Sequence, residues 1–250
     1  MTAEPFIAYQ DEWLTLYQGD CRRVMVGYAD PNYDAVITDP PYGDTSLEWD
    51  RRTDEWVGLL RSNQVWCFGS MAFFMDQDKA FRDAGWKYAQ EVVWEKHNGS
   101  GFAADRFRRV HEFAVHYYRG PWGDLYRDVQ TTPDATARTV RRKTRPTHTG
   151  HIGNGSYASQ DGGPRLMRSV LQVRSEHGRA VHPTQKPLGI LEPLIQFSVP
   201  LGGLVLDPFA GSGSTLLAAR RCGRRAIGIE VDPEYVAAAV QRLSQMELTA

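Results

Sequence analysis

The last part of the chain alternates between short apolar runs and longer helical patterns, and this alternation constrains the fold most strongly. The order is an apolar run at 203–206, a helical pattern at 214–222, a run at 225–229 and a helical pattern at 235–246. Such an order is typical of βαβ units, whose parallel strands are covered by the connecting helices. Further strands are predicted at 13–17, 33–38, 64–68, 86–96 and 111–119. We therefore expect an α/β fold with a doubly wound, mostly parallel sheet.

Polar residues also mark where several helices begin. Asp20 can cap a helix over 21–26, because its carboxylate can accept a free N–H of the first turn. Thr184 or Gln185 can cap a helix over 186–199 in the same way. The other helices that precede the last third of the chain are predicted at 54–61 and 71–84.

A rigid turn follows the strand predicted at 33–38. It consists of Asp39, Pro40, Pro41 and Tyr42. Neither proline has an N–H to donate to a sheet ladder, so the chain has to leave the sheet here. The turn presents a carboxylate, carbonyl groups and an aromatic ring at the carboxyl end of a strand, where open α/β sheets bind their ligands. The alternative interpretation is a surface turn with a capping aspartate.

A second turn, rich in small residues, connects the strand at 203–206 to the helix at 214–222. Its sequence from Asp207 to Thr215 lets the backbone approach a ligand closely, and the helix start presents free N–H groups. No Gly-Lys-Ser/Thr follows, so the turn is not a phosphate loop. Glu230 ends the next strand at nearly the spacing of an acidic residue that binds ribose hydroxyls. A ribose and an amino-acid carboxylate without phosphates describe S-adenosylmethionine.

The charge of the chain is distributed unevenly. The net charge is −1 overall, but it is −8 for residues 1–100, +7 for residues 101–180 and 0 for the rest. Residues 121–181 lack apolar periodicity and contain the densest basic run, 138–145. Basic side chains interspersed with hydroxyl, amide and aromatic groups suit contacts to phosphates and base edges. We predict a nucleic-acid-reading segment, and the alternative is a disordered surface insertion.

Composition excludes several other classes. The chain has no apolar run long enough to cross a membrane and no secretory signal at its start. Cys21, Cys67 and Cys222 lie far apart and form no metal-binding spacing, so we expect reduced thiols, no metal and a cytoplasmic protein. With the predicted nucleic-acid-reading segment, we expect it to be associated with the nucleoid.

Three motifs in this order resemble those of the β class of amino-group DNA methyltransferases, which methylate adenine N6 or cytosine N4. They are Asp39-Pro-Pro-Tyr42, His182-Pro-Thr-Gln-Lys-Pro187 and Asp207-Pro-Phe-Ala-Gly-Ser-Gly-Ser-Thr215. The resemblance covers about 14–246 apart from 121–181. It implies a Rossmann-like, circularly permuted fold with a mostly parallel seven-stranded sheet. The catalytic half would be 1–120, the target-recognition insertion 121–181 and the cofactor-binding half 182–250.

The resemblance also implies roles for individual residues. The catalytic residues would be Asp39, Pro40, Pro41 and Tyr42. The residues that hold S-adenosylmethionine, which leaves as S-adenosylhomocysteine, would be Asp20, Asp207, Phe209, Ala210, Gly211, Ser212, Gly213, Thr215, Glu230, His182, Thr184, Gln185 and Lys186. Double-stranded DNA would contact Arg106, Arg108, Arg109, Arg138, Arg141, Arg142, Lys143 and Arg145. Some relatives form dimers, so a homodimer and a cognate restriction endonuclease are candidate partners.

The first residue of the catalytic motif bears on the target base. An aspartate at position 39 favours adenine N6, because cytosine-N4 members of the family usually have serine there. The competing hypotheses are cytosine-N4 methylation, methylation of a protein amide and a DNA-binding regulator with a decayed site. The basic segment argues against the protein substrate, and the intact motifs argue against decay.

Overall fold

The computed structural model describes residues 4–29, 32–43, 50–100, 105–142, 155–175 and 185–247. The chain divides into two compact units, a main unit of residues 1–128 and 169–250 and a second unit of residues 129–168. No helix in the described ranges combines the length and the apolar character needed to cross a bilayer.

The main unit is built on a mixed sheet that is mostly parallel. In the described residues its nine strands have the order β1 (Phe6–Gln10), β2 (Leu14–Gln18), β13 (Arg225–Glu230), β12 (Leu204–Asp207), β3 (Ala35–Thr38), β4 (Gln64–Gly69), β6 (Arg109–Tyr118), β5 (Lys87–Ser100) and β11 (Val170–Gln172). Strands β2, β13, β12, β3 and β4 are mutually parallel, whereas β6 is antiparallel to both of its neighbours. The seven predicted strands are the central seven, whereas the edge strands β1 and β11 were not predicted from the sequence.

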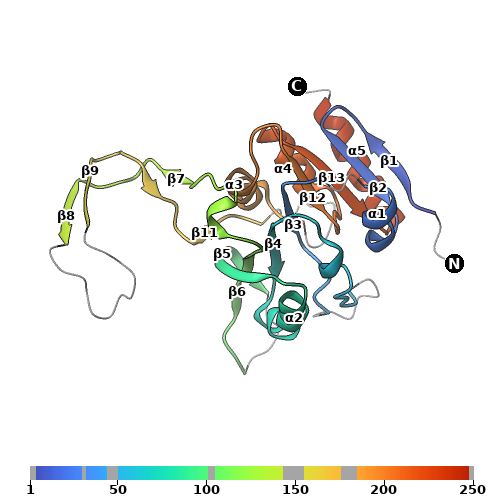
Figure 1. Cartoon of the computed structure of the whole chain (residues 1–250), viewed down its shortest axis with the longest axis horizontal. Coiled ribbons are helices and arrows are strands. Elements are labelled where there is room, and N and C mark those ends of the chain that lie inside the picture. Colours follow the sequence, from blue (N-terminus) through green and yellow to red (C-terminus); the bar gives the residue numbers. More distant parts are fainter. Residues whose placement is uncertain are drawn as a thin grey trace. The chain divides into compact units, whose positions relative to one another are not determined.

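Helices cover both faces of this sheet. Helices α3 (Leu188–Ser198), α4 (Ser214–Arg221) and α5 (Pro233–Glu247) lie on one face (Figure 1). Helix α1 (Cys21–Gly27), the 3₁₀ turn η1 (Val57–Leu59) and helix α2 (Met71–Asp83) lie on the other. The side chains of each strand alternate between these two layers, and Ile37 packs with the first group of helices while Val36 packs with the second. The doubly wound α/β fold predicted from the sequence is confirmed.

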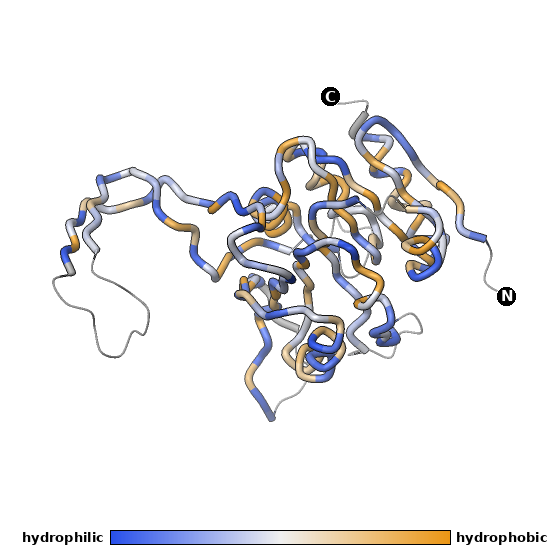
Figure 2. The backbone as a smooth tube through the Cα atoms, in the orientation of Figure 1, coloured by the Kyte–Doolittle hydropathy of each residue, from blue (hydrophilic) through white to orange (hydrophobic). Residues whose placement is uncertain are grey.

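Aromatic side chains fill much of the interior. Trp56, Trp66, Phe68, Phe73 and Phe81 are all at most 1% exposed. Each such side chain contributes roughly 1.5–3 kcal/mol by leaving water. Figure 2 shows the hydrophobic residues concentrated in the central strands and in the helices that pack on them. This core fixes the carboxyl ends of the strands relative to one another.

Two predicted helices differ in the structure. The helix expected at 54–61 is only the short turn η1. The helix expected to start at 186 begins one residue after Pro187, which occupies the N-cap position without a side-chain cap. Capping by Gln185 is therefore wrong, and Thr184 lies outside the described residues. A residue before proline is driven away from helical geometry, which explains the later start.

The second unit is built from short antiparallel strands rather than from a packed core. Strand β7 (Thr131–Thr132) pairs with β10 (Arg165–Leu166), and β8 (Arg138–Arg142) pairs with β9 (Gly155–Ser159). Ala135 is the only buried residue among the described residues of this unit. Backbone hydrogen bonds define these strands, so apolar periodicity could not reveal them.

Candidate active site

The predicted site residues meet where three neighbouring strands end. Asp39 follows β3, Asp207 is the last residue of β12 and Glu230 is the last residue of β13. The sheet order β13-β12-β3 brings these three carboxylates to one edge, although they are far apart in sequence. A cavity of about 380 Å³ opens there. The predicted residues that line it are Asp20, Asp39, Pro41, Gln185, Lys186, Asp207, Phe209, Ala210, Gly211, Ser212, Thr215 and Glu230.

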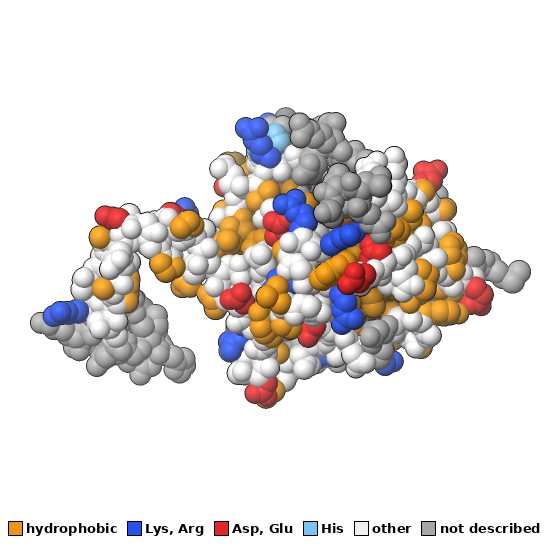
Figure 3. Space-filling view, turned by 90° about the horizontal axis from the view of Figure 1, so that it is seen from above, with side chains coloured by type: hydrophobic (Ala, Val, Ile, Leu, Met, Phe, Trp, Pro, Cys, Tyr) orange, Lys and Arg blue, Asp and Glu red, His pale blue; other side chains and the backbone are white. Residues whose placement is uncertain are grey.

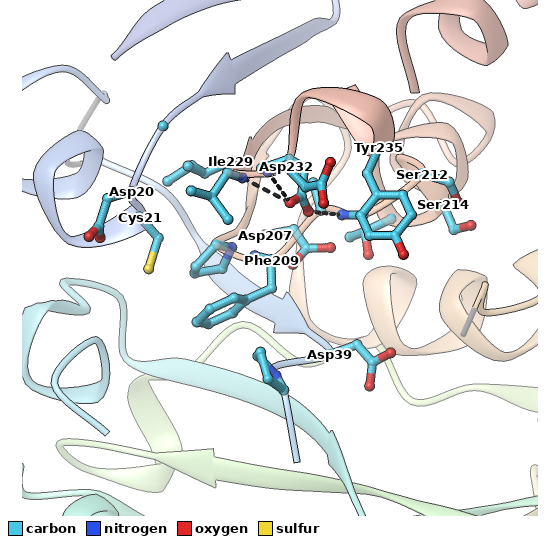
Figure 4. Close-up of a pocket in the computed structure, with 18 of the residues that line it drawn as sticks. Asp20, Cys21, Asp39, Asp207, Phe209, Ser212, Ser214, Ile229, Asp232 and Tyr235 are labelled. Carbon is cyan, nitrogen blue, oxygen red and sulfur yellow. Dashed lines mark hydrogen bonds between the residues drawn. The ribbon is translucent and has the colours of Figure 1, made fainter. Parts of the chain in front are cut away.

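Different elements contribute to the walls of this cavity. Figure 4 shows Asp20 and Cys21 on one side, Ser212 and Tyr235 on another, and Asp39 on a third. Pro40 and Tyr42 adjoin the lining residues in the turn after β3, and Gly213 adjoins them in the turn before α4. The predicted residues His182 and Thr184 lie outside the described part of the chain.

Close packing shapes the glycine-rich turn between β12 and α4. Gly213 occupies the N-cap of α4 with a φ of 77°, a left-handed conformation that glycine adopts without strain. A Cβ at Gly228 on β13 would lie 2.9 Å from the Cβ of Ala210, so only glycine lets the strand approach this turn. Arg242 on α5 fixes the turn from outside by donating to the Ser212 carbonyl at 2.6 Å. Packing against β13 and the hydrogen bond from α5 thus fix the position of this turn beside the cavity.

Backbone amides hold the Glu230 carboxylate in one orientation. Oε2 accepts from the N–H of Gly211, and Oε1 accepts from the N–H groups of Val231 and Asp232, each at 2.8 Å (Figure 4). Burial raises the pKa of Glu230, and the three amides oppose this effect by stabilising the ionised form. Oε1 has both lone pairs occupied, whereas Oε2 keeps one free, so the carboxylate can still accept a hydrogen bond from a hydroxyl group of a ligand.

Asp207 connects the glycine-rich turn to the proline turn through hydrogen bonds. Its Oδ1 accepts from the Thr38 hydroxyl at 2.8 Å and from the Phe209 N–H at 3.1 Å. Burial raises the pKa of Asp207 to about 6. Thr38 directly precedes Asp39, so this bond couples the glycine-rich turn to the proline turn.

Asp20 lies at the opposite side of the cavity and caps α1 as predicted. Its Oδ1 accepts from the Arg22 N–H at 2.9 Å, and its Oδ2 forms an ion pair with the Arg22 guanidinium. These contacts with Arg22 lower the pKa of Asp20, so the carboxylate is ionised at neutral pH.

Two donors engage the Asp39 carboxylate. The Tyr42 hydroxyl donates to Oδ1, and the Lys186 ammonium donates to Oδ2. Burial raises the pKa of Asp39, while the positive charge of Lys186 opposes this rise. The ring of Tyr42 packs against Phe73 with 5.3 Å between centroids, and Pro40 is buried beside it. Lys186, which was expected to hold the cofactor, thus has its charged group at the proline turn.

An acidic residue next to Lys186 was not predicted from the sequence. Glu112 on β6 lies 3.6 Å from the Lys186 ammonium and 3.0 Å from that of Lys96 on β5. The available signal in the sequence was an acidic residue directly before the apolar run that begins at Phe113. Arg242 was missed as well, because a helical arginine facing a turn cannot be distinguished from a solvated one by spacing.

The predicted DNA-binding arginines belong to two regions. Arg109 is the first residue of β6 in the main unit, and Arg106 and Arg108 lie in the segment before it, where Arg106 forms an ion pair with Asp105. Arg138 and Arg141 are exposed on β8 of the second unit, which also contains Arg142. Lys143 and Arg145 fall outside the described residues. In the described ranges, no group of His, Cys, Asp and Glu is arranged to hold a metal ion.

Comparison with known proteins identifies the family. A family model described as DNA methylase, that of the N6/N4 methyltransferases, matches residues 33–241. The chain belongs to this DNA methylase family. The Type II methyltransferase M2.MboI of Moraxella bovis is 25% identical over 98% of this chain and 93% of its own length. The Type II methyltransferase M2.LlaDCHI of Lactococcus lactis subsp. cremoris is 26% identical over 95% and 91%.

Solved structures share the fold of this DNA methylase. The M1.HpyAVI–SAM complex has a TM-score of 0.62 and 24% identity, over 92% of this chain and 99% of that chain. The cytosine-N4-specific PvuII DNA methyltransferase has a TM-score of 0.66 and 18% identity, over 94% and 88%. The α/β fold expected from the motifs is therefore the fold of these solved methyltransferases.

Proposed function

We propose that this DNA methylase transfers a methyl group from S-adenosylmethionine to the N6 amino group of adenine in duplex DNA. The observation that carries the proposal is the single cavity that joins the proline turn after β3 to Glu230 and the glycine-rich turn. A site for an amino group and a site for a nucleoside cofactor are thereby adjacent.

The cavity fits the chemistry of S-adenosylmethionine. Its volume of about 380 Å³ lies in the range of ligand pockets. Glu230 would accept from the ribose hydroxyls, Asp20 would lie near the adenine, and the free N–H groups at the start of α4 would bind the amino-acid carboxylate. Asp20, Asp207 and Glu230 disfavour a polyphosphate at the same place, because like charges repel. When bound, S-adenosylmethionine supplies an electrophilic methyl group on a sulfonium.

The proline turn can make an amino group of a base more nucleophilic. The nitrogen shares its lone pair with the ring, so it is a poor nucleophile while it stays planar. The Asp39 carboxylate and the Pro40 carbonyl can accept its two N–H groups, which favours a pyramidal nitrogen with its lone pair free. Pro40 has no N–H of its own that would compete. Positioning and electrostatic stabilisation then supply most of the rate.

Tyr42 supplies a surface for the target base. Its hydroxyl is held by Asp39 and its ring lies against Phe73, so the ring is fixed before a base arrives. The amino group of adenine is inaccessible inside a base pair, so the base has to leave the stack. Stacking of the extruded base on Tyr42 would offset part of the cost of unstacking.

We expect duplex DNA incubated with the protein and S-adenosylmethionine to contain N6-methyladenine. Liquid chromatography with mass spectrometry of the nucleosides measures this, and sequencing of the modified bases gives the recognition motif in the same experiment. N4-methylcytosine without N6-methyladenine would instead establish the cytosine alternative, which the fold likeness to a cytosine-N4-specific enzyme leaves open. Absence of both, with intact binding of cofactor and DNA, would favour a decayed regulator.

The second unit is the proposed reader of the DNA sequence. It lies within the predicted insertion 121–181, and the exposed residues Arg138 and Arg141 share β8. On the face of the main unit that Figure 3 shows, charges of both signs are interspersed among the described side chains. The Type II relatives further support a cognate restriction endonuclease as a partner, and a homodimer remains a prediction.

Replacing Arg138 and Arg141 together by glutamine is expected to weaken DNA binding and to flatten its salt dependence. Each lost phosphate contact reduces the slope of log K against log salt by about 0.9. Fluorescence anisotropy over a salt series measures this slope. The comparison variant replaces Arg108 and Arg109, which are also predicted to contact DNA, by glutamine. If the comparison variant changes the slope and the β8 variant does not, the DNA-binding surface is at the start of β6.

A further inference from the structure

A row of alternating charges, each at most 23% exposed in its side chain, runs from the proline turn into the sheet. It consists of Asp39, Lys186, Glu112 and Lys96 in this order, contributed by the turn after β3, the segment before α3, β6 and β5. The Lys186 side chain is only 6% exposed, and that of Glu112 is 12% exposed. Two negative and two positive charges compensate one another, which allows a charged network to stay inside the protein.

Aromatic rings surround the Lys186 ammonium. Its Nζ lies 5.2 Å from the ring centroid of Phe68, 5.8 Å from that of Tyr42 and 5.9 Å from that of Trp94. Cations within about 6 Å of such rings are stabilised by the negative ring faces. The three rings leave the ammonium to face Asp39 on one side and Glu112 on another. Its two carboxylate partners raise the pKa of Lys186 despite burial, so the group stays charged.

We propose that Lys186, backed by Glu112, is a positioning residue that maintains the negative charge of Asp39 and directs its carboxylate toward the target amino group. The proposal rests on the proposed catalytic role of Asp39. Only an ionised carboxylate can accept an N–H at both oxygens. With Tyr42 on Oδ1 and Lys186 on Oδ2, each oxygen has one lone pair occupied, and the remaining acceptor directions are fixed for the substrate.

Lys186 and Glu112 act on the ionisation of Asp39 in opposite directions, and this difference can be tested. The titratable groups that face it are Tyr42 from its own turn, Lys186 from the segment before α3, Glu112 from β6, Cys67 from β4 and Asp207 from β12. Burial and Glu112 raise the pKa of Asp39, and Lys186 lowers it. Removing the lysine charge and removing the glutamate charge should therefore shift the titration of Asp39 in opposite directions.

The experiment compares Lys186→Met and Glu112→Gln by single-turnover methylation at saturating DNA and S-adenosylmethionine from acid to alkaline pH. We expect Lys186→Met to move the acid limb upward by about 1 pH unit or more. Glu112→Gln should move it downward, because the negative charge beside Asp39 is lost. Lys186→Arg, which keeps the positive charge, should leave the limb near its original position. Exposed Lys79→Met and Glu91→Gln serve as matched controls.

A merely structural role would lower the activity of both variants without moving either acid limb, and this result overturns the proposal. If Lys186→Met does not fold, Lys186→Gln takes its place as the variant without the positive charge, and an unmoved limb in that variant overturns the proposal equally. The variant Asp39→Ala distinguishes a failure of the proposed catalytic role of Asp39 from a failure of the proposed role of Lys186. Full activity of Asp39→Ala overturns the proposed function of the turn, whereas an inactive Asp39→Ala with unmoved limbs overturns only the role of Lys186 and Glu112.

Discussion

Replacing Asp39 by alanine is expected to slow methyl transfer by about 10³-fold, a loss of the size seen when one stabilising hydrogen-bond partner is removed from an active site. The variant loses the carboxylate that accepts from the amino group and leaves only the Pro40 carbonyl. Without this acceptor, the nitrogen lone pair stays delocalised into the ring. Single-turnover kinetics with radiolabelled S-adenosylmethionine measure the rate of the chemical step.

Cofactor binding provides the internal control for this prediction. Glu230 and the glycine-rich turn are untouched, so the Kd for S-adenosylmethionine should change by less than about tenfold, ~1.4 kcal/mol. Asp83→Ala at the exposed end of α2 is the matched substitution and should retain full activity. If calorimetry shows that Asp39→Ala has lost cofactor affinity instead, Asp39 belongs to the cofactor site and its proposed catalytic role is wrong.

Replacing Glu230 by glutamine is expected to raise the Kd for S-adenosylmethionine by about 10²-fold, ~3 kcal/mol, because hydrogen bonds to a charged acceptor are lost. The carboxylate now accepts from three backbone N–H groups, and an amide offers only one oxygen to them. The NH₂ group of the glutamine would face a backbone N–H or a ribose hydroxyl, and both of these are donors. Either the turn or the ribose therefore loses its hydrogen-bond acceptor. Isothermal titration calorimetry measures the change directly.

The ionisation of Glu230 gives this prediction a second readout. Burial raises its pKa, and the ionised form is the one that accepts from the ribose. Affinity should therefore weaken as the pH falls through the pKa of Glu230, and the glutamine variant should lack this dependence. Glu234→Gln in the exposed first turn of α5 is the control. Equal affinities of Glu230→Gln and this control would show that the ribose binds elsewhere.

Local sequence patterns were sufficient to predict most of the strands and helices of the main unit. Apolar runs marked β3, β4 and β12, which are buried over their whole length, and alternation marked the more exposed strands β2, β5 and β6. The start of α1 at Asp20 followed from one capping side chain. The edge strand β1 was missed because its exposed Phe6 and Ile7 form no buried face. The strands of the second unit were missed because backbone pairing leaves no pattern in the side chains.

The sequence by itself determined which turns could bind a ligand, since the lack of an N–H in proline and the small size of glycine are local properties. It also indicated Glu230, because the distance from a turn to the end of the next strand is short. Only the tertiary structure decided that Lys186 faces Asp39 and that Glu112 stands behind it. These groups come from the proline turn, the segment before α3 and strand β6, and only the packed sheet brings their charges within reach of one another. The proline turn is therefore a local feature of the sequence, whereas the charge that acts on it is a product of the fold.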